Sequence, residues 1–361
     1  MAESLLNRII RHIEMSGPLP LAEYMHWCMS DRQSGYYQTG KPIGQKGDFV
    51  TAPEVSQMFG ELIGIWALNA WHELGCPKPF NLVELGPGNG TLMKDMLRAT
   101  SISEAFANAV NVQMIEISGT LANIQSQVLG NAAKVEWHTE IDKVPDQPSI
   151  IIANEFLDVL PFRQYVKSGG KWHENCVGFD DTRNLSWVLG AGVLDTQDLP
   201  QEHINEPDGA VFEVSNTRET FVTNIAKIIR KNTGVALFID YGHMKSGFGD
   251  TFQAIREHSF ADPLSEPGKC DLTSHVDFDA LKRAVTGKEL EVYPVMTQGE
   301  FLLSMGLLQR AGELGKGKDA ATQERLKLEA ERLALPDKMG NLFKVFAFST
   351  IPDLPPFAKQ G

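Results

Sequence analysis

The sequence has few cysteines and lacks the spacing that cysteine-rich sites need. Its four cysteines are scattered along the chain at Cys28, Cys76, Cys176 and Cys270, and no two of them form a C-x-x-C pair. Neither a disulfide framework nor a zinc site is therefore indicated, and no metal site is predicted.

A surplus of basic residues is also missing. Lys and Arg number 33 against 46 Asp and Glu, so the formal net charge is −13 at pH 7. Because binding to nucleic acid depends on cations that neutralise phosphates, this balance argues against a general nucleic-acid binder. An acidic chain would suit a cationic partner, such as a basic segment of another protein, although acidic charge also promotes solubility.

Long hydrophobic runs and targeting signals are absent as well. The sequence has no stretch of about 18 apolar residues that could span a bilayer. Its first residues show neither the apolar segment of a signal peptide nor an Arg- and Ser-rich transit segment. We therefore expect a cytoplasmic protein of bacterial type, without stable membrane insertion. At 361 residues the chain can bury a large core, in one elaborated domain or two.

The most informative stretch is a cluster of three glycines at residues 86–90. An apolar run with Leu82, Val83 and Leu85 precedes the cluster, and apolar residues at helical spacing follow it from Leu92. This order of strand, tight turn and helix is typical of the opening βα unit of a doubly wound sheet. Glycine is needed where the backbone turns sharply or where a ligand approaches closer than a Cβ would allow.

Two classes of ligand bind at such a turn. Dinucleotides require G-x-G-x-x-G, whereas Gly90 comes one position too early here and Thr91 takes the third glycine's place. The G-x-G-x-G spacing, with Glu84 in the strand end, resembles the S-adenosylmethionine sites of Rossmann-like methyltransferases. That cofactor is a cation without phosphate, so an acidic strand end suits it better than a diphosphate. A dinucleotide site and a purely structural turn are the alternatives.

A carboxylate follows the next predicted strand. Glu116 ends the strand at 112–116 and lies 26 residues beyond Gly90. A Rossmann-like fold places a carboxylate at about this distance to bind the ribose hydroxyls of its ligand. Chance alone often places an acidic residue here, so Glu116 gains weight only together with the glycine turn.

Acidic residues also follow two further predicted strands. The continuous apolar run at 149–153 indicates a parallel strand covered on both faces, and Asn154, Glu155 and Asp158 come directly after it. Asp240 likewise follows the predicted strand at 235–239. Ligands of open α/β sheets bind beyond the carboxyl ends of the strands, so we expect chemistry at these residues. Capping of a helix start is the alternative for Glu155 and Asp158.

The predicted fold class is α/β, a Rossmann-like class I methyltransferase sheet with a helical N-terminal region and inserted antiparallel β-hairpins. The expected divisions are 1–79 (helical N-terminal region with a long loop at 31–54), 80–162 and 206–350 (Rossmann-like core, with helical additions at 249–335), 163–205 (inserted β-hairpins) and 351–361 (flexible tail). The hairpins would suit either dimerisation, as a homodimer, or docking of a protein substrate.

Several separate stretches together resemble one family. They are residues 47–60, 84–90, 154–161, 240–242, 267–278 and 339–344, among which Thr51-Ala52-Pro53-Glu54 and 271–278 are the most specific. Along nearly its whole length the chain is similar to the MidA family, whose mitochondrial members methylate an arginine of the 49-kDa subunit of respiratory complex I during its assembly. The resemblance implies an S-adenosylmethionine-dependent protein-arginine N-methyltransferase that acts on such a subunit.

The resemblance and the strand ends together predict the site residues. The expected cofactor-binding residues are Thr51, Pro53, Glu84, Gly86, Pro87, Gly88, Asn89, Gly90, Glu116, Ile117 and Asn154, and the expected catalytic residues are Glu155, Asp158, Asp240 and His258. A guanidinium stays protonated and has no free lone pair, so carboxylates must hold it and draw its charge away from the attacking nitrogen.

Supporting roles are expected for other polar residues of the predicted loops. Asp48 or Glu54 would assist the carboxylates, and His258 or His275 would relay the departing proton. Tyr36 and Tyr37 are expected either to wall the pocket or to belong to the core. A small-molecule methyltransferase with a closed apolar pocket, and a cofactor-binding assembly factor without turnover, are the alternative functions.

Overall fold

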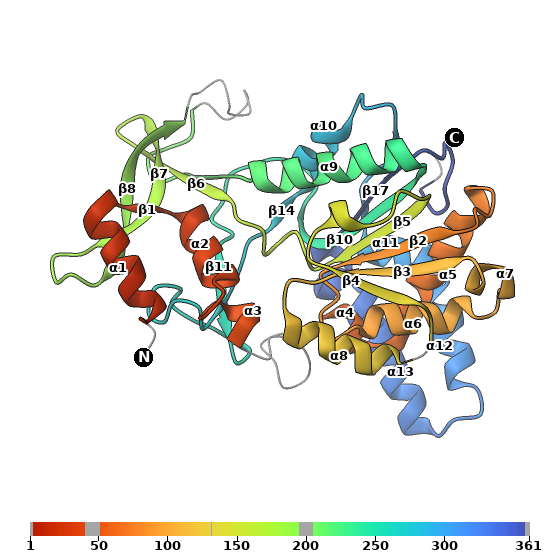
Figure 1. Ribbon diagram of the computed structural model, residues 1–361. Coiled ribbons are helices and arrows are strands. Elements are labelled where there is room, and N and C mark those ends of the chain that lie inside the picture. The colour runs from red at the N-terminus through yellow and green to blue at the C-terminus, as the bar shows by residue number, and fades with distance from the viewer. Residues whose placement is uncertain (1–2, 40–50, 131, 195–204, 358–361) are drawn as a thin grey trace.

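The computed structural model describes residues 3–39, 51–130, 132–194 and 205–357. Two parts are visible in Figure 1. One is a core of parallel strands between two layers of helices, and the other is a smaller hairpin lobe built on α1 (Leu5–Ser16) and α2 (Leu21–Ser30). Among the described residues, no helix combines the length and apolar character needed to cross a bilayer.

The core sheet has the strand order of a doubly wound fold, β15-β17-β10-β5-β2-β3-β4. Its parallel strands are β2 (Phe80–Leu85), β3 (Val110–Ile115), β4 (Val135–His138), β5 (Ser149–Asn154) and β10 (Gly234–His243). From β2 the chain proceeds outward through β3 and β4, and then returns to place β5 on the other side of β2. The carboxyl ends of β2 and β5 therefore flank the point where the strand order reverses, which is where such sheets bind ligands.

The sheet ends in short or antiparallel strands beyond β10. The strand β17 (Phe343–Ser349) pairs antiparallel with β10, and its far edge pairs with β15 (Glu291–Val292) and β16 (Met296–Thr297). On its other side β10 extends beyond the sheet to pair in parallel with β14 (Val276–Asp277). The antiparallel strand β17 therefore completes this side of the sheet.

Both faces of the sheet are covered, as the continuous apolar strands predict. Leu82 of β2 packs in the apolar cluster formed with α5 (Gln57–Glu73) and α6 (Thr91–Thr100). Its neighbour Val83 points the other way, into the cluster formed with α9 (Asn216–Asn232) and α10 (Phe278–Val285). Because side chains alternate along a strand, every core strand needs apolar residues on both sides, each contributing about 1.5–3 kcal/mol when fully buried.

The hairpin lobe is larger than the sequence indicated. The antiparallel strands β6 (Arg163–Ser168), β7 (Lys171–Phe179) and β8 (Leu185–Leu194) form the predicted hairpins. However, β9 (Val211–Val214) pairs with β6, and β1 (Leu19–Pro20) pairs with β7. The sheet therefore continues past the expected boundary at residue 205 and takes in a strand of the N-terminal region, because the open edges of β6 and β7 are paired by distant segments.

Shorter elements join the two parts. A small sheet contains β11 (Gln253–Arg256), β12 (Ser259–Phe260) and β13 (Asp271–Thr273), and its Leu272 shares an apolar cluster with α1 and α2. The remaining short helices are α3 (Tyr36–Thr39), α4 (Ala52–Val55), α7 (Glu104–Ala107) and α8 (Gly119–Leu129), with 3₁₀ turn η1 (Ile141–Lys143).

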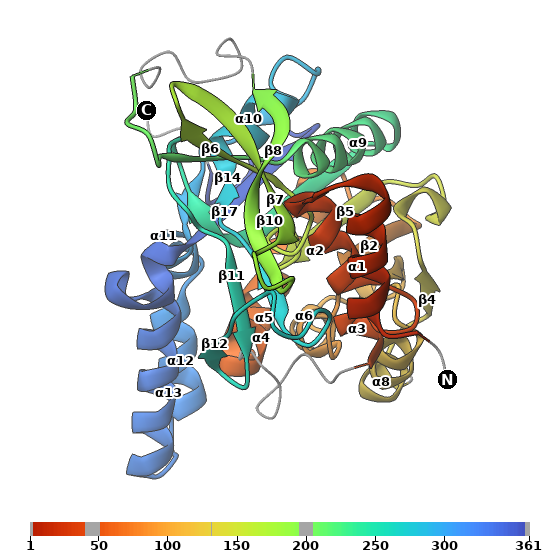
Figure 2. The same cartoon turned by 90° about the vertical axis from the view of Figure 1, so that its left-hand side faces the viewer.

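Three helices near the C-terminus attach to the core on the side away from α9 and α10. Figure 2 shows α12 (Leu307–Gly315) and α13 (Ala320–Ala334) side by side. Gly306, at φ +90°, follows the end of α11 (Gln298–Ser304) and is the N-cap of α12, so it separates these two helices. After α13, the π-helical turn η4 (Pro336–Gly340) leads into β17.

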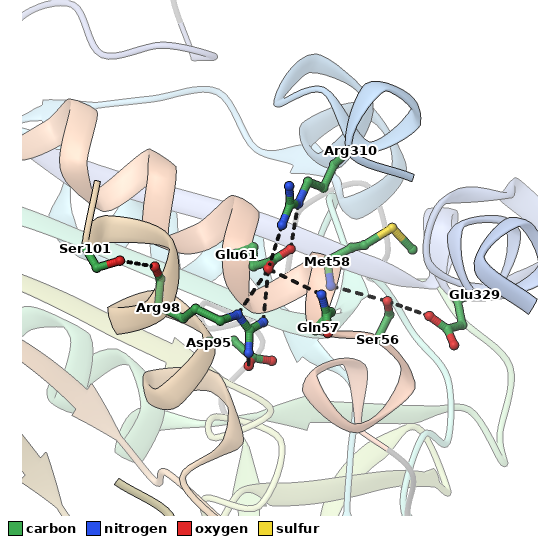
Figure 3. Close-up of polar contacts among 9 residues, drawn as sticks. All are labelled: Ser56, Gln57, Met58, Glu61, Asp95, Arg98, Ser101, Arg310 and Glu329. Atoms are coloured by element: carbon green, nitrogen blue, oxygen red, sulfur yellow. Dashed lines mark hydrogen bonds and ion pairs between the residues drawn. The ribbon is translucent and has the colours of Figure 1, made fainter. Parts of the chain in front are cut away.

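A buried carboxylate fastens α12 to the core (Figure 3). Glu61 of α5 accepts hydrogen bonds from Nε of Arg310 at 2.8 Å and from Nη2 of Arg98 at 3.0 Å, and it is only 4% exposed. Burial alone would raise the pKa of Glu61, but the hydrogen bonds and charges of Arg310 and Arg98 lower it. Nearby, the hydroxyl of Ser56 donates to Glu329 of α13 at 2.8 Å, so α13 is tied to the segment that precedes α5.

Candidate active site

A cleft lies beyond the carboxyl ends of β2 and β5, where the fold predicts a ligand. Its lining residues are Thr51, Pro53, Glu54, Glu84, Gly86, Pro87, Gly88, Asn89, Thr91, Leu92, Asn154 and Glu155. The cleft thus brings together most of the residues expected to bind the cofactor. Of the others, Gly90 is the N-cap of α6, whereas Glu116 and Ile117 follow the neighbouring strand β3.

The three glycines of the turn all have left-handed backbone conformations, at φ +61° for Gly86, +55° for Gly88 and +80° for Gly90. A Cβ on Gly86 would lie 2.7 Å from Cδ2 of Phe156, and one on Gly90 would lie 3.3 Å from Cγ of Gln125. The left-handed φ values agree with the expectation that glycine is needed where the backbone turns sharply. Neighbouring side chains of the protein itself also occupy the space that a Cβ would take.

The carboxylate of Glu84 is buried in this cleft. The side chain is 3% exposed, and its Oε2 has no hydrogen-bond partner within the described part of the chain. Burial raises the pKa of Glu84 to about 8, although a hydrogen bond to the backbone of Met93 opposes the shift, and the charge of Glu116 adds to it. An unpaired acceptor at this depth needs a donor, and an ammonium group would supply both a donor and a compensating charge.

At the end of β3, Glu116 is held for a different contact. Its Oε1 accepts from the backbone N–H of Ser118 at 2.7 Å, and its Oε2 accepts from Nε2 of Gln125 at 3.0 Å. Burial raises the pKa of this carboxyl group as well. Ile117 next to it is 51% exposed and offers an apolar surface. The pair fits the ribose hydroxyls and the flat base of S-adenosylmethionine, and Glu84 fits the ammonium of its amino acid part.

The short helix α4 closes one side of the cleft. The backbone N–H of Ala52 donates to Oε1 of Glu155 at 3.1 Å. Oε1 of Glu54 accepts from the hydroxyl of Thr91 at 2.7 Å and from Nδ2 of Asn89 at 3.3 Å. Glu54 therefore binds the glycine turn and the start of α6, where a carboxylate also complements the helix dipole. Asp48, its suggested alternative, lies outside the described residues.

Glu155 is held in a strained conformation at the end of β5. Its φ of +51° is left-handed, which costs a residue with a side chain about 1–2 kcal/mol. Its Oε1 also accepts from Nδ2 of Asn154 at 3.1 Å. Burial raises the pKa of Glu155 to about 7, and the charge of Asp158 contributes to the shift. Such strain at a ligand cleft, with a carboxyl group poised near neutrality, is typical of a functional position.

Asp240 maintains the backbone of this turn. Its Oδ2 accepts from three successive N–H groups, those of Phe156 at 3.1 Å, Leu157 at 2.9 Å and Asp158 at 3.2 Å. Burial, followed by the charges of Asp158 and Glu155, raises the pKa of Asp240. The side chain is 1% exposed and does not line the cleft. The structure thus places the expected catalytic Asp240 where it positions Glu155 and Asp158 rather than where it would touch a substrate.

Asp158 is buried one turn behind Glu155. Its Oδ2 accepts from the hydroxyl of Tyr241 at 2.6 Å, whereas its Oδ1 has no hydrogen-bond partner among the described residues. Burial raises the pKa of Asp158, and the bond from Tyr241 opposes this. The phenol of Tyr37 belongs to the same group, because burial and then the charges of Asp271 and Asp158 raise its pKa. Its neighbour Tyr36 is buried in the core of the hairpin lobe, and Tyr37 also packs against that core.

The two candidate histidines differ in position. Glu257 and His258 both have positive φ, +50° and +62°, and form the tight turn between β11 and β12. Side chains of such a turn point to solvent, and the exposed His258 does not line the cleft. The ring of His275 instead lies 5.6 Å from the ring of Tyr241, and burial lowers its pKa, with further lowering by His243 and Lys344. His275 lines a different cavity, together with Arg218 and Thr251, so neither candidate histidine lines the cofactor cleft.

Arg218 supports the site and was not expected from the sequence. Buried to 3% exposure on α9, it donates from Nη2 to the carbonyl of Asp158 at 2.8 Å and from Nη1 to the carbonyl of His275 at 2.9 Å. It shares one helix face with Val222, Ile225 and Ile229, which are buried in the core. An arginine in register with an apolar stripe was the signal that could have revealed it.

Comparisons with known proteins agree with this geometry. The model of the family of S-adenosyl-L-methionine-dependent methyltransferases named Methyltransf_28 matches residues 62–296. The protein arginine methyltransferase NDUFAF7, mitochondrial, of Xenopus tropicalis is 35% identical and is aligned over 99% of this chain and 90% of its own length. The human protein of the same name is 33% identical over 96% of this chain and 84% of its own length.

A solved structure supports the cofactor. A Burkholderia thailandensis protein crystallised with S-adenosyl-homocysteine superposes with a TM-score of 0.85 at 25% identity, covering 99% of this chain and 95% of that chain. The predicted fold class is confirmed, and so is S-adenosylmethionine as the cofactor. The acidic cleft, with its unpaired buried acceptor and glycine turn, fits that group.

The expected cytoplasmic location is wrong. The relatives from Xenopus tropicalis, Xenopus laevis and human are all named as mitochondrial proteins, and they point to mitochondria rather than to the cytoplasm. The expectation relied on the lack of a recognisable transit segment, which does not determine where a protein works.

The family match over most of the chain, the relatives aligned along nearly all of it, and the cleft chemistry lead to one conclusion. The chain belongs to the Methyltransf_28 family of S-adenosyl-L-methionine-dependent methyltransferases and is an enzyme of that class.

Proposed function

We propose that the protein is a protein-arginine N-methyltransferase whose substrate is a respiratory complex I subunit of the 49-kDa type, methylated during assembly of that complex. One observation carries the choice of arginine. Two carboxylates, the half-buried Glu155 and the buried Asp158, stand in a single turn, and the first of them lines the cofactor cleft. The names of the relatives support the same acceptor, and the MidA resemblance supports the subunit.

The acidic turn suits a guanidinium for electrostatic reasons. A buried carboxylate is costly unless its oxygens are satisfied. The hydroxyl of Tyr241 and the charge of Arg218 offset part of this cost for Asp158, whose Oδ1 has no hydrogen-bond partner within the described residues. A guanidinium offers five N–H donors in a planar fork, which can satisfy two carboxylates at once. Glu155 would orient the reacting nitrogen toward the cleft, while Asp158, held by Tyr241, would bind the far side of the same group.

The proton released during methyl transfer also has an acceptor. When bound, S-adenosylmethionine supplies a methyl group activated by its positively charged sulfur. The acceptor nitrogen must lose a proton as its new bond to carbon forms. Glu155, whose pKa burial raises to about 7, is basic enough to take that proton and acidic enough to release it again near neutral pH. Positioning of the two reactants accounts for the rest of the acceleration.

Mass spectrometry of the purified subunit after incubation with enzyme and S-adenosylmethionine tests this function. We expect methyl groups on arginine with the unmodified enzyme. With Asp158→Asn we expect turnover to fall by about a hundredfold or more, while affinity for S-adenosyl-homocysteine stays within about twofold. The exposed Asp142→Asn is the matched control and should leave both unchanged. Methylation of a metabolite alone would indicate a small-molecule methyltransferase, and cofactor binding without any product would indicate an assembly factor.

A further inference from the structure

The side chain of Gln125 links two parts of the cofactor site that lie far apart in the sequence. It is fully buried in the middle of α8. Its Nε2 donates to the carbonyl oxygen of Gly88 at 2.8 Å and to Oε2 of Glu116 at 3.0 Å. The first partner belongs to the glycine turn and the second to the end of β3, so one amide group spans the two strand ends that hold opposite halves of the cofactor.

Trp137 of β4 determines which way this amide points. Its Nε1 donates to Oε1 of Gln125 at 2.9 Å. An indole N–H is a donor only, so the atom that faces it must be the amide oxygen. The amide nitrogen then faces Gly88 and Glu116, both of which present acceptors, and its two hydrogens match them one to one. Every hydrogen-bonding group of Gln125 except one lone pair of its oxygen is therefore assigned by its neighbours.

The glycine turn is fitted to the same side chain. A Cβ added at Gly90 would lie 3.3 Å from Cγ and 3.4 Å from Cα of Gln125. Glycine at this position lets α8 pack directly against the turn. The carboxylate of Glu116 is fixed from its other side by the backbone N–H of Ser118, the residue that caps α8. The start and the middle of α8 thus hold Glu116 between them.

We propose that Gln125 is a positioning residue for the cofactor, which couples the glycine turn to the ribose-binding carboxylate through an amide whose orientation Trp137 sets. The two halves of the site then behave as one unit. A shift of the Glu116 carboxylate moves the carbonyl group of Gly88 through Gln125, and a change in the glycine turn moves Glu116 in the same way. A ligand that touches only the ribose side, such as adenosine, should depend on Gln125 as strongly as S-adenosyl-homocysteine does.

Three variants test the coupling. Gln125→Met keeps the length of the side chain but removes both donors. Gln125→Glu keeps the shape but places an acid against two acceptors. Trp137→Phe keeps the amide and frees its orientation. The control is Gln113→Met, since Gln113 is also buried at this sheet edge and bonded to a ring nitrogen, that of His138, at 2.6 Å, without touching the glycine turn. Titration calorimetry with S-adenosyl-homocysteine and with adenosine, at pH 6 and pH 8, gives the affinities.

We expect Gln125→Met to bind both ligands roughly tenfold more weakly, because a hydrogen bond to a charged group is lost. The Gln125→Glu variant should lose further affinity, relative to the unmodified protein, as the pH rises, because the new carboxyl group must stay protonated beside Glu116. A double-mutant cycle with Glu116→Gln should show losses that do not add. In the protein without ligand, the indole N–H resonance of Trp137, assigned by its loss in Trp137→Phe, should shift in Gln125→Met.

Two results would overturn the coupling. One is affinity of folded Gln125→Met within twofold of the unmodified protein for both ligands. The other is an equal loss in Gln113→Met, which would show that disturbance of the sheet edge is the whole effect. If Gln125→Met does not fold, the ligand affinities of Trp137→Phe and Gln125→Glu test the coupling instead. Unchanged affinity in the first, together with no added pH dependence in the second, would likewise exclude the role.

Discussion

The hydroxyl of Tyr241 donates to Oδ2 of Asp158 at 2.6 Å, so a neutral donor holds one oxygen of a buried carboxylate and leaves the other without a partner in the described structure. Tyr241 lies on β10 and Asp158 in the turn after β5. These two strands are neighbours in the sheet, which explains why the bond forms between residues 83 positions apart.

Replacing Tyr241 should separate acceptor binding from cofactor binding. In Tyr241→Phe the carboxylate of Asp158 loses its only side-chain donor in the described structure. A hydrogen bond to a charged group is worth about 1.5–3 kcal/mol, so we expect turnover on the protein substrate to fall by about tenfold. Affinity for S-adenosyl-homocysteine should change less than twofold. Steady-state kinetics and calorimetry measure the two quantities. A loss of cofactor affinity as large as the loss of turnover would remove Asp158 and Tyr241 from the acceptor site.

The glycine turn should not tolerate a branched side chain. Gly88→Val places a Cβ on a residue at φ +55°, which costs about 1–2 kcal/mol in backbone strain, and it adds bulk to the cleft wall. We expect binding of S-adenosyl-homocysteine to be abolished. Gly119→Ala is the matched control at the start of nearby α8, where an added Cβ meets nothing within 4 Å. Unchanged affinity in Gly88→Val would contradict the assignment of the whole cleft.

Binding of the cofactor should release a proton. Burial raises the pKa of Glu84 to about 8, so this group is mostly protonated at pH 7 in the free protein, and an ammonium placed beside it favours the ionised form. Calorimetry at pH 7 in buffers of different ionisation enthalpy should show release of up to about one proton, and affinity should rise from pH 6 to pH 8. Glu84→Gln should abolish the release. A binding enthalpy independent of the buffer would contradict the assigned contact.

The raised pKa of Glu84 also predicts how the stability of the protein changes with pH. The folded protein holds the proton of Glu84 more tightly than the unfolded chain does, so the folded state binds more protons between about pH 4.5 and pH 8. The contribution of Glu84 to the free energy of unfolding is therefore present in full below the pKa that Glu84 has in the unfolded chain. It is lost as the pH rises through the pKa that Glu84 has in the folded protein. In Glu84→Gln the slope of stability against pH in this range should be smaller, as urea denaturation at several pH values would reveal.

Asp240 should prove structural. In Asp240→Ala the three N–H groups of Phe156, Leu157 and Asp158 lose their acceptor, and we expect a loss of about 3 kcal/mol or more in the free energy of unfolding. Asp240→Asn keeps an acceptor oxygen and should retain more of both stability and turnover. Urea denaturation and kinetics of the two variants distinguish the roles. Full stability with no turnover in Asp240→Asn would instead make this carboxylate catalytic.

The attachment of α12 can be tested in the same way. Arg310→Met leaves Glu61, which is buried, with Arg98 as its only guanidinium in the described structure. We expect the free energy of unfolding to fall by about 1–2 kcal/mol. This is less than the cost of breaking a fully buried ion pair, because the Arg310 side chain is 39% exposed. Lys327→Met on the exposed face of α13 is the control and should change stability by less than about 0.5 kcal/mol. Equal losses in the two variants would show that the buried pair adds nothing.

Local patterns made the centre of the site predictable. The glycine turn after β2 and the polar residues after β5 are contiguous in the sequence, and parallel strands bring their carboxyl ends together at one edge. For that reason the strand ends, together with the family resemblance, indicated Glu84, Asn154 and Glu155 as site residues, and the fold gathers these three in one cleft.

Roles that depend on distant partners could not be predicted. Asp240 follows a strand just as Glu155 does, and only the register between β5 and β10 turns it toward the backbone of its neighbour. Gln125 is a single polar residue in a helix, and its role follows only from the packing of α8 against the glycine turn. The pairing of β9 with β6 is equally non-local, and the position of His258 depends on a hairpin turn that its sequence does not signal.

The segment that follows α4 depends on a contact with the C-terminal part of the chain. Ser56 is tied to Glu329, 273 residues later in the chain, and β17 at the far end completes the sheet beside β10. During synthesis from the N-terminus, contacts between such distant positions form only after the later residue has been made. During synthesis the glycine turn therefore emerges well before Glu329 and β17 do, and the contact that ties Ser56 to α13 can form only afterwards.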